Sequence, residues 1–289
     1  MASLIYHAGA LGDFITILPA AARWRRMHAG EAIILLGKPA YSPLASPSFD
    51  ETWDVQGRLF AGLFSDGGHV EAEVSRMLAR VASALVFAWP ASPLPRLLAD
   101  AGAREIVRQD PFPAGPVPIV DYHCSLFPAP LGDDEKIPRI SVGPSEMTGR
   151  PPVVLHPGSG SQKKNWPLER FHDLSLWLVE QGERVAWVLG PAEETTSIPR
   201  GHAAWRSLPL RELAGRLTCS RMFVGNDSGV THLAAAVGCP TVALFGDSDP
   251  LTWAPRGRRV AVVTSSTRSM NGIRLGDVLQ ACQDVVREK

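Results

Sequence analysis

Short apolar runs alternate with longer amphipathic stretches along most of this chain, a pattern that predicts parallel strands joined by helices. Residues 222–245 show it most clearly. Residues 222–224 are predicted to end a buried strand, and a helix with one apolar face follows, formed by Val230, Leu233, Ala234 and Val237. Gly238 and Pro240 end that helix, and residues 241–245 form a second buried strand. This segment is therefore predicted as strand, tight polar turn, helix and strand.

The chain opens in the same way. Residues 4–7 are predicted as a strand, residues 8–13 as a glycine-containing loop, and residues 14–27 as a helix in which Pro19 marks a kink or a late start. The same criteria predict further strands at residues 32–36, 52–55, 84–87, 105–107, 153–156 and 183–189. Further helices are predicted at residues 70–81, 93–101, 167–181 and 275–286, with others beginning near Pro116 and Leu208. Pro167 is expected at the first position of its helix, and a turn is expected at residues 66–69.

Two domains are expected from the length and from one break in the pattern. Residues 138–152 carry four prolines and two glycines without periodicity, which indicates a linker. The predicted domains are residues 1–150 and residues 151–289. Each begins with strand, glycine loop and helix, as two Rossmann-like domains of an α/β protein would.

Composition narrows the class of protein. The chain is 45% hydrophobic and 20% charged, as in ordinary globular proteins, and no apolar run approaches the roughly 18 residues of a membrane span. The zero net charge disfavours a nucleic-acid partner, but a local patch for peripheral contact with the inner membrane is compatible with it. The four cysteines lack metal-ligand or C-x-x-C spacing, and the N-terminus lacks the features of a signal peptide. We therefore expect a cytoplasmic protein.

Candidate chemistry gathers at two places in the second half. The turn at residues 225–229 leaves backbone N–H groups at a helix N-terminus, which favours an anion such as a diphosphate. Asp227, Ser228, Thr231 and His232 lie on this turn or in the first helical turn, although capping of the helix explains Asp227 and Ser228 equally well. The loop at residues 157–161 can also bring N–H groups against phosphate, and Lys163 and Lys164 follow it.

In the first half, Asp13 ends a glycine loop at the start of a helix. It is either a helix cap or a general base for a hydroxyl group. Gly9 and Gly12 are three residues apart, so the G-x-G-x-x-G fingerprint is absent, and no acidic residue ends the next predicted strand. A nicotinamide enzyme is therefore disfavoured.

Three motifs together resemble the heptosyltransferase family, the family 9 glycosyltransferases of the GT-B fold. They are Gly12-Asp13 followed by Pro19, the Pro157-Gly-Ser loop followed by Lys-Asn-Trp-Pro, and the run of residues 226–246. The resemblance is strong over residues 151–255, clear over residues 1–26 and weak from about 40 to 150. It implies two Rossmann-like domains facing across a cleft, and inverting, metal-independent transfer of heptose from ADP-heptose to lipopolysaccharide core.

The resemblance also implies residue roles. Asp13 matches the proposed catalytic base, and Lys164 matches the lysine that contacts the donor diphosphate, whereas Lys163 falls outside the motif. Glu193 matches a glutamate that bonds the nucleotide ribose, with adjacent Glu194 left as the alternative. The implied donor site comprises Gly12, Gly158, Ser159, Gly160, Lys164, Glu193, Asp227, Ser228, Gly229, Val230 and His232. No metal or cofactor is expected, and Asp247-Ser-Asp249 is not interpreted as a metal motif because its context matches the family's metal-independent segment. The last helix packs back toward the first domain in many GT-B proteins.

Three alternatives stay open at this point. The first is a glycosyltransferase of the same fold with a different donor or acceptor. Residues 1–150 carry 13 Lys and Arg against 16 Asp and Glu, which is an unfavourable surface for a phosphorylated core oligosaccharide. A second alternative is an inactive nucleotide-binding scaffold, and a third is a nucleotide-sugar epimerase or hydrolase. The expected acceptor is a saccharide or a lipid-linked saccharide. Its candidate contacts are Arg58, His69, His123 and Arg139, although a solvated surface role is the stronger expectation for each.

Overall fold

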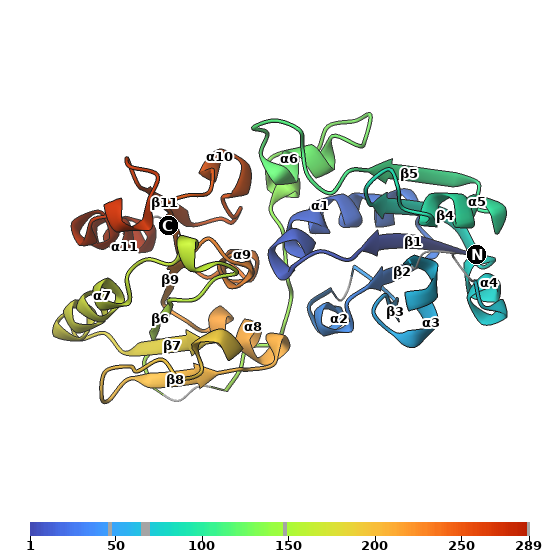
Figure 1. Ribbon diagram of the computed structural model, residues 1–289. Coiled ribbons are helices and arrows are strands. Elements are labelled where there is room, and N and C mark those ends of the chain that lie inside the picture. Colours follow the sequence, from blue (N-terminus) through green and yellow to red (C-terminus); the bar gives the residue numbers. More distant parts are fainter. Residues whose placement is uncertain (46–47, 65–69, 147–148, 288–289) are drawn as a thin grey trace. The chain divides into compact units, whose positions relative to one another are not determined.

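The computed structural model describes residues 1–45, 48–64, 70–146 and 149–287. The chain forms two compact units, each with its own core (Figure 1). The first unit comprises Met1–Gly115 with Ile119–Lys136, and the second comprises Pro116–Pro118 with Ile137–Lys289. Each unit is a parallel sheet with helices on both faces, so the predicted α/β class is confirmed.

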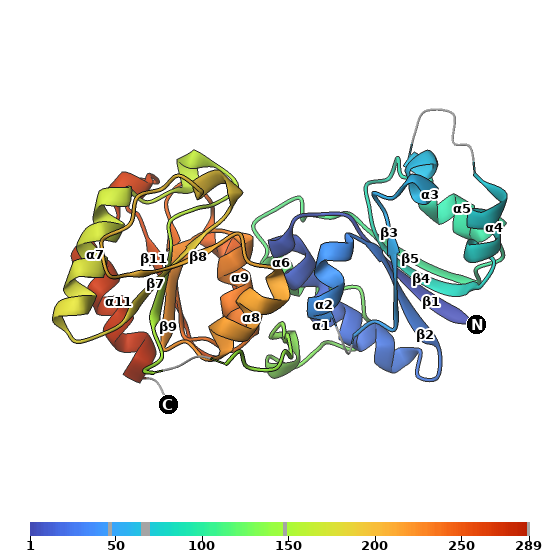
Figure 2. The ribbon, with the colours of Figure 1, turned by 90° about the horizontal axis from the view of Figure 1, so that it is seen from below.

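Within the described residues, the first unit has a five-stranded sheet in the order β3-β2-β1-β4-β5. Its strands are β1 (Ala2–His7), β2 (Ala32–Gly37), β3 (Glu51–Asp54), β4 (Val81–Phe87) and β5 (Glu105–Gln109). Its helices are α1 (Leu11–Met27), α2 (Ser42–Ala45), α3 (Arg58–Ala61), α4 (Ala72–Leu78), α5 (Leu94–Asp100) and α6 (Ile119–Cys124). Figure 2 shows α1 and α2 on one side of this sheet and α3, α4 and α5 on the other.

The order of strands reverses beside β1. The chain passes from β1 to β2 and β3 on one side, then returns to place β4 and β5 on the other. Loops that follow the strands on either side of such a reversal diverge, and ligands of open α/β sheets bind in the crevice between them. In this unit, those are the loops after His7 and after Phe87.

The second unit, over its described residues, has a six-stranded sheet in the order β11-β10-β9-β6-β7-β8, so its strand order reverses between β6 and β9. The strands are β6 (Val153–His156), β7 (Val185–Leu189), β8 (Ala203–Arg206), β9 (Met222–Asn226), β10 (Thr241–Phe245) and β11 (Val260–Thr264). The helices are α7 (Leu168–Glu180), α8 (Leu210–Thr218), α9 (Gly229–Ala236), α10 (Pro250–Trp253) and α11 (Leu275–Arg287). Figure 2 shows α7 and α11 on one face of the sheet and α8 and α9 on the other.

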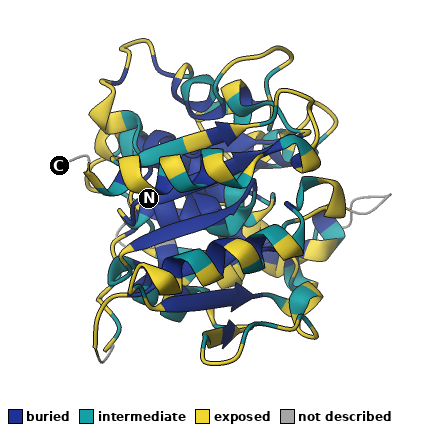
Figure 3. Cartoon of the chain, turned by 90° about the vertical axis from the view of Figure 1, so that its left-hand side faces the viewer, coloured by how far each residue is buried: buried dark blue, intermediate teal, exposed yellow. Residues whose placement is uncertain are grey.

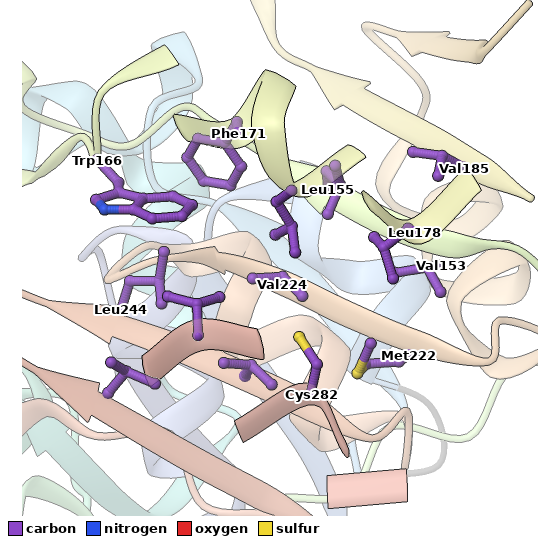
Figure 4. Close-up of a cluster of buried hydrophobic side chains, with 14 of the residues drawn as sticks. Val153, Leu155, Trp166, Phe171, Leu178, Val185, Met222, Val224, Leu244 and Cys282 are labelled. Atoms are coloured by element: carbon purple, nitrogen blue, oxygen red, sulfur yellow. The ribbon is translucent and has the colours of Figure 1, made fainter. Parts of the chain in front are cut away.

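A large apolar cluster lies between this sheet and the helices α7 and α11. Strands β6, β7 and β9 contribute branched aliphatic side chains, and α7 contributes Phe171 and Leu178 (Figure 4). Trp166, which precedes α7, is 1% exposed and belongs to the same cluster. Strands β6, β7, β9 and β10 are buried along their lengths, whereas α7 and α11 combine buried and exposed residues, as Figure 3 shows from this side. Burial of both sheet faces explains why these strands are continuous apolar runs in the sequence.

Most predicted elements are present, with boundary errors that have local causes. Helix α1 begins at Leu11, three residues before the predicted start, and contains Pro19. Helix α7 begins at Leu168, so the prediction that Pro167 occupies its first position was wrong by one residue. Gly238 has a φ of +85°, the left-handed conformation expected of a glycine that ends a helix. Strands β8 and β11 were not predicted; each is only four or five residues long and has a single buried residue. The predicted turn at residues 66–69 lies outside the described residues.

His123 corrects one prediction, because it is not a solvated surface residue. Its side chain is 2% exposed and its ring meets Phe87 edge-on, with 5.0 Å between ring centroids. Its Nδ1 lies 3.1 Å from Oε1 of Gln109, whose own amide nitrogen donates to the Tyr122 carbonyl. Nδ1 therefore carries the proton. Burial, with a smaller contribution from His7, lowers the pKa of His123 from 6.5 to about 3. Arg58 and Arg139 are exposed as expected, and His69 lies outside the described residues.

The buried neutral His123 predicts acid sensitivity. Below pH 6.5 the unfolded chain protonates this histidine while the folded chain does not, so stability falls as pH drops from 6.5 toward about 3. The expected slope is about 1.4 kcal/mol per pH unit. The substitution His123→Gln removes this contribution. We expect the free energy of unfolding of the wild type, relative to the variant, to fall by about 2 kcal/mol between pH 6.5 and pH 5. Urea unfolding of both proteins at the two pH values measures it, and equal pH slopes would contradict the assignment.

Candidate functional site

The buried amide of Asn226 ties together the two loops at the reversal of the second sheet. Asn226 ends β9 and is 0% exposed. Its Nδ2 donates to the carbonyl of Pro157, 2.7 Å away, in the loop that follows β6. Its Oδ1 accepts from the backbone N–H of Trp166 at 3.0 Å. One side chain thus fixes the glycine loop and the lysine-bearing segment against the end of β9.

The N-terminus of α9 lies directly after Asn226. Ser228 is its N-cap, and its Oγ accepts from the backbone N–H of Thr231 at 3.3 Å. The Thr231 hydroxyl donates to the Asn226 carbonyl, which locks the turn from below. The capping interpretation of Ser228 is therefore confirmed. The first-turn N–H groups of Gly229 and Val230 have no carbonyl one turn earlier in the helix to bond. They add to a helix end that carries roughly half a positive charge.

Lys164 brings a full positive charge to this place. Its Nζ lies 2.6 Å from Oδ2 of Asp227, which is only 9% exposed, whereas the Lys164 side chain is 37% exposed. Lys164 ends the 3-10 turn η4 (Gln162–Lys164), and Trp166 anchors the segment by burying its ring and donating from Nε1 to the Ile273 carbonyl at 3.1 Å. The neighbouring Lys163 is exposed. Burial of Trp166 therefore directs Lys164, and not Lys163, toward Asp227.

His232 lies one helical turn further along α9 and is 6% exposed. Burial, reinforced by the charge of Lys164, lowers its pKa to about 4, and this outweighs the opposite effects of Asp227 and of a hydrogen bond with the backbone of Trp253. The imidazole is therefore neutral near pH 7. It therefore adds no charge beside the Lys164–Asp227 pair.

A cavity of about 480 Å³ lies beside the glycine loop, within the second unit. Its lining comes from residues 157–168 and from the segment after β7, and includes Ser159, Gly160 and Glu193. Any side chain at Gly158 would meet the Glu193 carboxylate, so this glycine lets the loop pass close to it. Glu193 Oε2 accepts from the Gly190 N–H at 3.0 Å.

Glu193 and Glu194 differ in position. Glu193 lines the cavity of the glycine loop, whereas Glu194 uses its carbonyl to bond Arg206. The geometry therefore favours Glu193 over Glu194 as the residue that meets a ligand in this cavity.

The two remaining predicted residues, Gly12 and Asp13, belong to the first unit. They lie in the first turn of α1, and Asp13 Oδ2 accepts from the Ala10 N–H at 3.0 Å. Asp13 is therefore not the N-cap, which is Ala10; its carboxylate bonds the cap backbone from the third helical position. Asp13 also lines a cavity of about 460 Å³ at the reversal of the first sheet. A carboxylate oriented by a backbone bond and exposed to a cavity can accept a proton from a bound hydroxyl.

Within the Asp247-Ser-Asp249 sequence, Asp249 has a structural role. Asp249 caps α10, accepting from the Leu251 N–H at 3.0 Å and from the Thr252 hydroxyl at 2.9 Å. Both carboxylate oxygens are therefore engaged in the cap. Over the residues that the structure describes, no group of three or more His, Cys, Asp or Glu side chains is arranged to hold a metal ion. Nor does any described helix combine the length and apolarity needed to cross a membrane.

Sequence reasoning selected the candidate phosphate-binding residues but left out two residues that position their loops, Asn226 and Trp166. A polar residue at the end of an otherwise apolar strand was the available signal for Asn226. For Trp166 the signal was weaker, because a tryptophan beside two lysines and a proline gives no hint of which side is buried.

Comparisons with known proteins agree with this arrangement. The profile of glycosyltransferase family 9 (heptosyltransferase) matches residues 123–281, more than half of the chain. Lipooligosaccharide heptosyltransferase 2 of Haemophilus influenzae is 27% identical over 180 residues, which cover 57% of this chain and 50% of that protein. The match thus spans about half the length of that curated relative.

Two solved structures show the fold. The ADP-heptose lipopolysaccharide heptosyltransferase II of Escherichia coli superposes with a TM-score of 0.78 at 17% identity, covering 99% of this chain and 98% of that one. The iron-containing dodecameric glycosyltransferase TibC of enterotoxigenic E. coli gives a TM-score of 0.66 at 15% identity, covering 99% of this chain and 78% of that one. At these identities the likeness establishes the fold alone. The predicted GT-B class, with two Rossmann-like domains, is confirmed. Because the profile spans the Asn226 turn, the Lys164 segment and the glycine loop, the chain belongs to glycosyltransferase family 9, the heptosyltransferase family.

Proposed function

We propose that this protein is an inverting, metal-independent glycosyltransferase that moves a sugar from an ADP-sugar to a hydroxyl group of a saccharide or lipid-linked saccharide. Heptose is the first candidate for the sugar. The observation that carries the proposal is the convergence of Lys164, the N-terminus of α9 and the glycine loop at the reversal of the second sheet. The four cysteines are free thiols, which supports a cytoplasmic location. Peripheral contact with the inner membrane would bring a lipid-linked acceptor within reach.

The second domain, residues 151–289, would bind the donor. Lys164 and the N–H groups of Gly229 and Val230 supply positive charge for the diphosphate, and Ser159 and Gly160 border it. Glu193, in the adjacent cavity, would bond the ribose, with Gly158 allowing the loop to approach. As the glycosidic bond breaks, charge grows on the departing diphosphate, and preorganised donors aimed at that charge lower the barrier. Fixed positive groups can perform the role that a divalent cation has in other phosphate sites, which is the basis for proposing metal independence.

The first domain, residues 1–150, would bind the acceptor and supply the base. Asp13 would take the proton of the acceptor hydroxyl as the oxygen attacks the anomeric carbon from the face opposite the leaving diphosphate. A single displacement of this kind inverts the anomeric centre. Gly12 precedes Asp13 in the first turn of α1.

A different acceptor is the rival that one observation favours. Residues 1–150 have more acidic than basic residues, 16 against 13, which is unfavourable for a heavily phosphorylated core oligosaccharide. The same transfer chemistry with a non-lipopolysaccharide acceptor, and with another sugar, fits that surface better.

Lys164 and Lys163 form a matched pair for testing the donor site. We expect ADP to bind, and Lys164→Ala to weaken binding by about tenfold to a hundredfold, because a charge-assisted contact with the diphosphate is lost. Lys163→Ala should bind ADP like the wild type, since Lys163 is exposed and lies outside the Asp227 contact. Calorimetric titration with ADP, UDP and GDP measures both effects.

The same titration in EDTA tests metal independence, a question sharpened by the iron-containing relative. Undiminished ADP affinity in EDTA supports the proposal. Equal effects of the two lysine substitutions, or a stronger response to UDP or GDP, would contradict the donor site as drawn.

Asp13→Asn tests the base. The amide oxygen can still accept from the Ala10 N–H, so α1 keeps its cap, but the side chain can no longer take a proton. We expect the transfer rate from ADP-heptose to fall by about 10²–10⁴ with ADP affinity unchanged. A variant that transfers at the wild-type rate, or one that loses ADP binding in parallel with activity, would rule out this role.

A further inference from the structure

The cavity beside Asp13 lies where an open α/β sheet binds its ligand. It opens at the carboxyl ends of β1 and β4, between which the strand order of the first sheet reverses. His7 and Phe87, the last residues of those strands, line it, together with Asp13 from α1. Its volume of about 460 Å³ falls within the range of small-molecule sites, about 300–1,000 Å³. The cavity is therefore large enough for a sugar ring with a substituent.

Aromatic side chains gather on this cavity. Among the described residues, the exposed aromatic side chains are Phe64, Trp89 and Phe112, at 38%, 54% and 37% exposure, and all three line it. Trp89 and Phe112 meet edge-on with 6.2 Å between ring centroids. Phe64 stacks on Tyr6 at 5.6 Å. Elsewhere in the described chain the aromatic rings are buried or half-buried, so their exposure here indicates a binding surface rather than chance.

No cationic side chain lines the cavity among the residues that the structure describes. Of the described residues that line it, Asp13 alone carries a formal charge, and that charge is negative. His7 is neutral, because burial and then Lys38 lower its pKa to about 3. Arg108 does not line the cavity, and its Nη1 bonds the Asp110 carboxylate at 2.5 Å and the Ala88 carbonyl at 2.7 Å. Lys38 itself lies over the face of Tyr41, outside the lining. A phosphate or carboxylate would lose its water against aromatic rings and face the Asp13 carboxylate.

We propose that this cavity is the acceptor site and selects an uncharged hydroxyl compound with an apolar ring face. The C–H face of a neutral pyranoside, or its aryl substituent, would lie against Trp89 and Phe112, with a hydroxyl directed to Asp13. Trp89 and Phe112 then determine specificity without taking part in the proton transfer. This inference rests on the proposed function, since only transfer makes the cavity's ligand an acceptor.

The test compares two probes that differ in one charged group, phenyl β-D-glucopyranoside and its 6-phosphate. Calorimetric titration at millimolar concentrations should show the uncharged probe binding at least about tenfold more tightly. Trp89→Ala should weaken its binding about tenfold, and Trp89→Phe should restore most of it, because a ring face is kept. Leu176→Ala is the matched control, since Leu176 is also 54% exposed but lies on α7 of the second unit.

A second variant tests the proposal through a gain in affinity for the 6-phosphate, so that the test does not depend only on the loss of weak binding. Ala91 lines the cavity and is exposed, so Ala91→Lys adds the missing positive charge without disturbing a core. It should raise the affinity for the 6-phosphate about tenfold and leave the uncharged probe nearly unchanged. Tighter binding of the 6-phosphate by the wild type, no binding of the uncharged probe, or indifference to Trp89→Ala would each overturn the proposal.

Titration of the same variants with ADP separates this inference from the proposed function. ADP binding with no preference for the uncharged probe refutes the acceptor assignment alone. Absence of ADP binding to the wild type refutes the proposed transferase instead. A preference for the uncharged probe would then indicate a binding site without transfer.

Discussion

The buried amide of Asn226 is the contact on which the second unit's site depends. It donates to Pro157 and accepts from Trp166, two residues that approach from separate segments of the chain. Leaving a buried donor or acceptor unpaired costs about 1–3 kcal/mol. Moving either segment away from the end of β9 would leave the Asn226 amide unpaired, so both are held there. The buried ring of Trp166 packs in the core, and this packing fixes the backbone position of Lys164, two residues earlier. The ion pair with Asp227 then orients the Lys164 ammonium group beside the N-terminus of α9.

Both units use the same architectural device for different chemistry. In each sheet, the strand order reverses once, and the loops beside that reversal border the candidate site. In the second unit these loops present backbone N–H groups and a lysine, and the segment after β7 adds Glu193, a set that suits a nucleoside diphosphate. In the first unit they lead to Asp13 and carry Trp89, while Phe64 and Phe112 come from other segments, and this set suits a neutral hydroxyl compound. The fold thus sets where ligands bind, and the loop residues set what they are.

The sequence predicted the parts of this molecule that local pattern determines. The alternation of strand and helix, the cap at Ser228 and the glycine at 238 follow from residue preferences acting over a few positions. Strands β8 and β11 were missed although residues 203–205 and 260–263 are apolar, because such short runs do not distinguish a strand from other structures. The burial of His123 and the exposure of Trp89 could not be predicted either, since each depends on segments distant in sequence. Motifs identified Lys164 and Asp227, but only the fold shows Asn226 holding their loops together.

Hydrogen exchange at the start of α9 tests the central claim most directly. The N–H groups of Gly229 and Val230 have no intrahelical acceptor, so they should exchange rapidly in the free protein. If the diphosphate of ADP binds there, saturating ADP should slow their exchange, together with that of the glycine loop at residues 158–160. The slowing should be lost in Lys164→Ala at the same ADP concentration. Unchanged exchange at residues 229 and 230, with protection elsewhere in the chain, would contradict the account.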